Sequence, residues 1–161
     1  MKIITKNVAY VQKKDISFLL KSTVKVPEFL YLKLLEEADD MENKYEFVKF
    51  EDRDEIKFFK SMNWIIDYND IKNSSEDDII QMCKDAANEI NTIADKFNAM
   101  PDKKKEKHED MVQKCKLLEY KMHSLRDALW FKQGHINMSL PEITDYKKKS
   151  LLNMFKEKTD N

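Results

Sequence analysis

One group of residues in the second half of the chain has the spacing of metal ligands. Glu119, His123 and Asp127 recur at intervals of four, and on a helix this spacing brings side chains to one face, where two of them can share a metal ion. That face lies outside the apolar seam described below, where such residues usually form solvated charge pairs. We therefore expect no metal site and no bound cofactor.

Other catalytic signals are weak. The single glycine excludes a glycine-rich phosphate loop, and neither a G-x-S-x-G nor an H-E-x-x-H motif occurs. Cys83 and Cys115 fall at apolar seam positions, so we expect free, buried thiols rather than nucleophiles. No catalytic residue is assigned, and an enzyme of unrecognised class ranks third among the functional hypotheses.

Two charged clusters are the candidate binding surfaces. The first is acidic and lies on the outer face of an expected helix: Glu36, Glu37, Asp39, Asp40 and Glu42. The second is a lysine cluster at an expected turn: Lys103, Lys104, Lys105 and Lys107. An acidic face suits a basic groove on another protein, and a lysine cluster suits nucleic acid or an acidic protein. Each also fits ordinary solvated surface, and lysine without interleaved arginine or aromatic residues argues against base-specific recognition.

Composition bounds the fold. The 161 residues are 42% hydrophobic and 37% charged, with one Gly and three Pro, which is typical of long helices with short connections. The formal net charge of -1 gives no global attraction to nucleic acid or acidic membranes. Neither a membrane-spanning run nor a signal peptide is visible, so we expect a cytoplasmic protein that binds no membrane.

The strongest pattern predicts an antiparallel helical hairpin, in coiled-coil style, over residues 74–134. Two apolar series recur at alternating intervals of three and four, and the short connection at Pro101 forces the helices to fold back. In the resulting register Ile90 meets Cys115, and Glu89 faces Lys114. The two series are Ile79, Cys83, Ala86, Ile90, Ile93 and Phe97, then His108, Met111, Cys115, Leu118, Met122, Leu125 and Leu129.

The ends and the outer side of this hairpin carry further signals. Ser74 and Ser75 are good N-cap residues, and Gly134 suits a left-handed C-terminal cap. One side of the first helix is apolar, so we expect it to pack on the helices near 27–43 or 53–66. That side consists of Ile80, Ala87 and Ala94.

The pattern of residues 1–73 predicts a small α/β portion with a short antiparallel or mixed sheet. Strands are expected at 2–12 and 45–50, and a helix capped by Asp52 or Asp54 should follow. Residues 16–26 and 64–68 suit either helix or strand. A helix is expected from Pro27 to about Asn43, with a buried face formed by Tyr31, Leu34, Leu35, Ala38 and Met41.

The overall prediction is a mostly helical α+β protein with a single domain at residues 1–141. Alternating Ile136, Met138 and Leu140 predict a strand at 135–141 that returns to the N-terminal sheet. The polar stretch 142–161 is expected to be a tail or a loose helix.

The chain is small, has an acidic patch and lacks a catalytic motif. It is also rich in Lys, Asn and Ile, which suggests an AT-rich genome. This combination resembles the accessory proteins of phages and mobile elements, including anti-CRISPR and other anti-defence inhibitors. The resemblance implies a non-enzymatic module that binds and inhibits a host defence protein, through the acidic face and the hairpin. A nucleic-acid-binding accessory role for the lysine cluster is the alternative, and a second copy of the chain is another possible partner.

Overall fold

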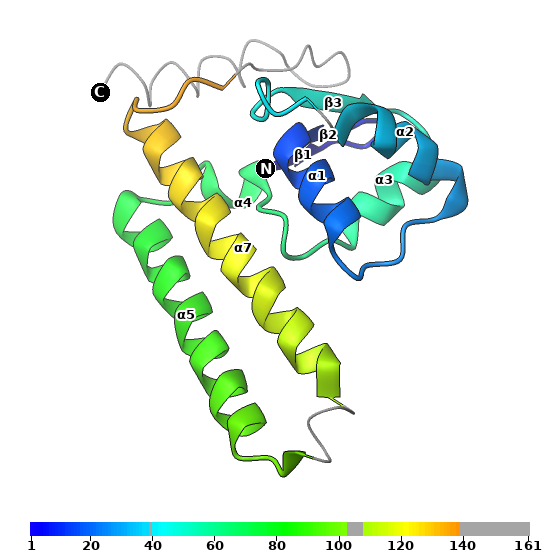
Figure 1. Cartoon of the computed structure of the whole chain (residues 1–161). Helices are drawn as coiled ribbons and strands as arrows, with labels where there is room; N and C mark the ends of the chain where they lie inside the picture. The colour runs from blue at the N-terminus through cyan, green and yellow to red at the C-terminus, as the bar shows by residue number, and fades with distance from the viewer. Residues whose placement is uncertain (39, 103–107, 139–161) are drawn as a thin grey trace.

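The computed structural model describes residues 1–38, 40–102 and 108–138. Figure 1 shows an N-terminal body, made of a sheet and short helices, and a long helical hairpin that extends away from it. The mostly helical α+β architecture is therefore confirmed. None of the described helices combines the length and the apolar character that crossing a bilayer requires.

The sheet has three antiparallel strands in the order β1 (Lys2–Ile4), β2 (Ala9–Gln12) and β3 (Phe47–Phe50). The prediction of one strand over 2–12 is wrong, because the chain turns between β1 and β2. The Thr5 hydroxyl closes this turn: its Oγ1 accepts from the Val8 amide at 3.0 Å and donates to the Val8 carbonyl at 3.1 Å. A side chain that bonds to the nearby backbone in this way competes with a continuous strand.

Both faces of the sheet are covered, and alternation along the central strand separates two cores. Ala9 and Val11 join one apolar cluster with residues of α1 (Lys13–Lys21), α2 (Glu28–Ala38) and α3 (Arg53–Lys60). Val8 and Tyr10 join the other, with α4 (Tyr68–Ile71) and the base of the hairpin. The sheet thus connects the small helices to the hairpin.

Residues 16–26 and 64–68, left open by the sequence, now have a structure. Residues 16–21 belong to α1 and residues 22–26 form neither helix nor strand, whereas residues 64–67 form a turn that leads into α4 and includes a parallel bridge from Lys2 to Asp67. Asp52 caps α3, as expected, by accepting from the Asp54 amide at 2.8 Å.

The buried face of α2 differs from the prediction. Leu30 and Leu34 are the residues that enter the core, whereas Tyr31, Leu35 and Met41 are exposed. The helix also ends at Ala38, earlier than expected. The prediction is therefore right for Leu34 and for Ala38, which packs half-buried against the same core, and wrong for the other three residues. Apolar residues lie on two sides of this helix, and helical spacing alone does not decide which side is buried.

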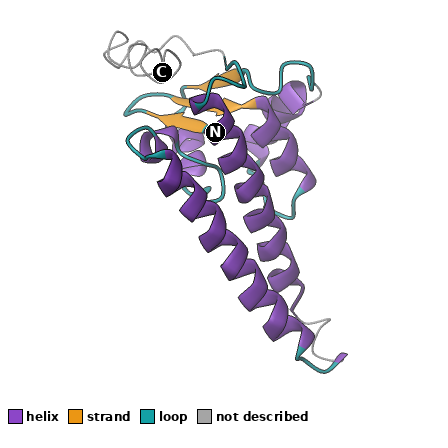
Figure 2. Ribbon diagram, turned by 90° about the vertical axis from the view of Figure 1, so that its left-hand side faces the viewer, coloured by secondary structure: helices purple, strands orange, loops and turns teal. Residues whose placement is uncertain are grey.

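The hairpin is confirmed. Its helices are α5 (Glu76–Asn98) and α7 (Glu109–Lys132), which lie side by side in both Figure 1 and Figure 2. Cys115 Sγ lies 3.9 Å from the Ile90 carbonyl, and Lys114 forms an ion pair with Glu89 at 3.5 Å, which supports the expected register. Both cysteines are free but half-buried rather than fully buried.

The ends of the hairpin match their sequence signals. The Ser75 hydroxyl accepts from the Asp78 amide at 3.1 Å, and the Asp78 side chain accepts from the Ser75 amide at 3.2 Å. This reciprocal capping box satisfies two backbone donors that would otherwise lack partners. Gly134 follows α7 with a φ of 79°, the left-handed conformation that favours glycine.

The body packs on α7, so the expected contact with the apolar side of α5 is wrong. Ile80 on α5 is 40% exposed, while Leu125, Ala128 and Phe131 of α7 are buried against the sheet. An aromatic contact joins the body to α7: Tyr120 of α7 stacks on Phe18 of α1, with ring centroids 3.8 Å apart. The apolar side of α5 consists of Ile80, Ala87 and Ala94 and offers no aromatic ring for such a contact.

A polar network completes the junction between α7 and the body. The Tyr120 hydroxyl donates to Asp15 Oδ1 at 2.9 Å, and Lys14 pairs with Asp127 at 2.8 Å. The other oxygen of Asp15 accepts from the Met1 amino group, which also donates to Gln12 Oε1 at 2.9 Å. Burial and the Asp15 charge raise the pKa of Tyr120, so its hydroxyl remains a donor.

Residues 135–138 form no strand, so this part of the expected returning strand is wrong. The segment nevertheless reaches the body, because Met138 is buried and its sulfur accepts from Gln12 Nε2 at 3.4 Å. Residues 139–141 and the expected tail at 142–161 lie outside the described residues.

Candidate protein-binding surface

The outer face of α2 carries an unusual concentration of exposed apolar side chains. Leu32 is 71% exposed and Phe29 57%, and Tyr31 and Leu35 lie beside them. Spacings of three and four residues link Phe29 to Leu32, Leu32 to Leu35, and Tyr31 to Leu35, so these side chains form one continuous patch. We call these four residues the α2 patch.

The α2 patch exists because α2 is apolar on two opposite sides. Leu30 and Leu34 are fully buried in the core that α2 shares with α1 and the sheet. A helix that is apolar nearly all round is normally covered on every side. Contiguous apolar surface on a soluble protein usually marks a contact with another molecule.

Three acidic side chains at and beyond the C-terminal end of α2 share one lysine. Lys13 Nζ lies 2.8 Å from Asp40, 3.7 Å from Glu46 and 3.9 Å from Glu37. Its hydrogen bond lowers the pKa of Asp40, and the same contact raises the pKa of Lys13. The predicted acidic face is thus partly an internal ion-pair network.

The remaining predicted site residues divide into two groups. Glu36 and Glu42 are exposed, and Glu36 lies on α2 beside Leu32. The others fall outside the described residues: Asp39, Lys103, Lys104, Lys105 and Lys107. Binding by the lysine cluster therefore stays a prediction.

The stripe on α7 with metal-ligand spacing is divided between two other interactions. Glu119 and His123 form an exposed pair at 4.0 Å, while Asp127 is paired with Lys14. Within the described ranges, no group of three His, Cys, Asp or Glu side chains could hold a metal ion. Burial raises the pKa of Cys83, which reduces the fraction of reactive thiolate.

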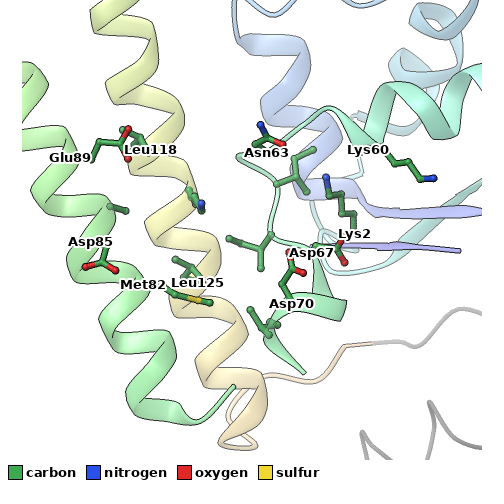
Figure 3. Close-up of a pocket in the computed structure, with 15 residues that line it drawn as sticks. Lys2, Lys60, Asn63, Asp67, Asp70, Met82, Asp85, Glu89, Leu118 and Leu125 are labelled. Atoms are coloured by element: carbon green, nitrogen blue, oxygen red, sulfur yellow. The ribbon is translucent and has the colours of Figure 1, made fainter. Parts of the chain in front are cut away.

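A cleft of about 390 Å³ separates α5 from the body, and the sequence did not reveal it. In Figure 3, Asp85 and Glu89 project from α5, Leu118 and Leu125 come from α7, and Asp67 and Asp70 come from the body. Residues from four separate segments of the chain line it, so no local sequence motif could have predicted it. Only the i, i+3 and i, i+4 spacing of the two acidic pairs was visible beforehand.

Searches of protein-family models, of curated proteins and of solved structures found no match to this chain. Its surfaces are therefore interpreted from their own residues.

Proposed function

We propose that this protein is a non-enzymatic protein-binding module and that the α2 patch is its contact surface. The observation that carries the proposal is the exposure of four large apolar side chains on one helix face. Phe29, Leu32 and Leu35 follow the spacing by which an amphipathic helix inserts its anchors into an apolar groove. Figure 1 shows α2 on the side of the body opposite the hairpin.

The surroundings of the α2 patch define the partner's chemistry. Glu28 and Glu36 lie on the same helix, and no lysine or arginine forms an ion pair with them in the described part of the chain. A complementary groove would therefore be apolar at its centre and basic at its rim. The resemblance to phage accessory proteins makes a host defence protein with such a groove the first partner class to test.

The energetic scale of the contact can be estimated. Full burial of a large apolar side chain contributes roughly 1.5–3 kcal/mol, so completing the burial of Leu32 offers about 1–2 kcal/mol. Replacing Leu32 by Asp also places a charge in the contact, and we expect a total loss of about 2 kcal/mol, or roughly 30-fold in affinity.

The test is photo-crosslinking with a reactive residue at position 32, in lysate of a low-GC bacterium. The matched control has the same residue at position 80, because Ile80 is a 40% exposed apolar residue on the hairpin. A single protein crosslinked from position 32 and absent from position 80 supports the proposal. The purified partner should then bind Leu32→Asp about 30-fold more weakly than wild type, and Ile80→Asp normally.

Two results would contradict this function. Equal crosslinking from both positions would indicate nonspecific contact. Recovery that disappears after nuclease treatment would instead favour the nucleic-acid-binding alternative. Circular dichroism of each variant separates lost binding from lost folding.

A further inference from the structure

The cleft between α5, α7 and residues 60–71 combines an apolar base with acidic walls. Side chains of α5, α7 and the body supply the base: Ile65, Ile66, Ile71, Ala86, Leu118 and Leu125. Asp67 and Asp70 stand on the body side, and Asp85 stands on α5 (Figure 3). A volume of about 390 Å³ lies within the range of small-molecule sites.

The acidic side chains of the cleft differ in their partners: Glu89 pairs with Lys114 at 3.5 Å, and Asp85 accepts from Gln81 Nε2 at 2.9 Å. In the described ranges no ion pair joins a lysine or arginine to Asp67, Asp70 or Asp85. Lys2 lines the cleft, but its ammonium group donates to the carbonyls of Phe59 and Met62 at 2.8 and 2.9 Å. Burial raises the pKa of Asp67, and the Asp70 charge adds to this shift, while the bond from the Asn69 amide and the Lys2 charge oppose it. A bound cation would relieve the repulsion between Asp67 and Asp70.

We propose that this cleft binds a small organic ammonium ion with an apolar body. The ammonium group would lie against Asp67 and Asp70, and the apolar part would cover Leu118 and Leu125. A metal ion fits poorly, because it needs several oxygen ligands at short distance and no described group of three acidic, His or Cys side chains meets that need. An organic cation interacts at longer range and also uses the apolar base.

An anionic ligand is disfavoured by the same residues. Of the four acidic side chains that line the cleft, Glu89 is already paired with Lys114, and Lys2 keeps its positive charge while its ammonium group is bonded to backbone carbonyls. Lys60 and Lys121 also line the cleft. The net charge of the lining is therefore close to balanced, and the preference for a cation rests on the neighbouring carboxylates of Asp67 and Asp70, which would repel an anion placed beside them.

The experiment compares three probes that share a six-carbon chain: hexylamine, hexanol and hexanoate. Each is titrated into the full chain at pH 7 and followed by amide chemical shifts in ¹H–¹⁵N NMR spectra. Hexylamine should shift amides of residues 65–71 and 82–89 saturably, with a dissociation constant on the order of 1 mM, as expected of a probe this small. Hexanol should bind at least about tenfold more weakly, and hexanoate should give no saturable shift.

Variants then test whether the ammonium group of hexylamine binds beside Asp67 and Asp70. The double variant Asp67→Asn, Asp70→Asn should weaken hexylamine binding about tenfold or more, which corresponds to ~1.4 kcal/mol. Asparagine preserves the cap that Asp67 gives α4, where its Oδ1 accepts from the Asn69 amide, so the fold should be retained. Asp110→Asn, on an exposed site at the other end of the hairpin, is the matched control and should bind normally.

The proposal is overturned by any of three results. Equal binding of hexanol would show that the acidic walls are irrelevant, and unchanged binding by the double variant would place the cation elsewhere. Absence of saturable shifts at residues 65–71 and 82–89 would show that the cleft does not take this class of ligand. None of these readouts depends on the partner proposed for the α2 patch.

Discussion

The junction between the hairpin and the body can be tested through a single oxygen atom. Tyr120→Phe retains the ring that stacks on Phe18 but removes the hydroxyl that donates to Asp15 at 2.9 Å. The Asp15 side chain is fully buried, so the oxygen that loses this donor cannot turn to water. Hydrogen bonds to charged groups contribute about 1.5–3 kcal/mol, and we expect the free energy of unfolding to fall by about 2 kcal/mol.

The assay is urea unfolding, supported by thermal melts. A loss of about 2 kcal/mol should lower the melting temperature by roughly 4–8 °C in a chain of this size. Tyr31→Phe is the matched control, because Tyr31 is 46% exposed, and its stability should change by less than about 0.5 kcal/mol. If Tyr120→Phe unfolds like wild type, the hydroxyl does not stabilise the junction and packing alone attaches α7.

Three further predictions concern pH, a helix end and a helix start. Burial lowers the pKa of the Met1 amine from 8.0 to about 5, so in a chain that starts at Met1 the unfolded state binds more protons between these values. The free energy of unfolding should therefore fall from pH 8 to pH 5, by at most about 4 kcal/mol, and a flat urea-unfolding profile would contradict this. Gly134→Ala should cost about 1 kcal/mol in the same assay, since nothing lies within 4 Å of the added Cβ and the positive φ is its only obstacle. Ser75→Ala should cost about 1 kcal/mol through the lost cap, whereas Ser61→Ala, at an exposed helix end, should cost less.

The hairpin could be predicted because its signals are local. Ser75 caps its own helix, Gly134 ends the second one, and the seam repeats within each helix at a fixed spacing. A short connection then determined that Ile90 meets Cys115. Each of these steps depends on residues near one another in sequence, and a long regular pattern leaves few alternatives.

The candidate surfaces could not be predicted in the same way, because they depend on which distant segment covers which face. Helical spacing places Leu34 and Leu35 on neighbouring faces of α2, and nothing local indicates that the core takes Leu30 and Leu34. The neutralisation of Asp40 required Lys13, which is 27 positions away. The packing of the body on α7 likewise involves a contact between residues far apart in sequence, the stacking of Tyr120 on Phe18.

The packing of the body on α7 bears on both proposed surfaces. Because the body attaches through α7, α5 has no described helix of the body packed along its outer side, and the space between α5 and the body becomes the cleft rather than a packed interface. The α2 patch lies on the body and contributes no residue to the cleft. A variant such as Leu32→Asp should therefore weaken partner binding about 30-fold without altering the response to hexylamine. The two surfaces can accordingly be tested, and refuted, separately.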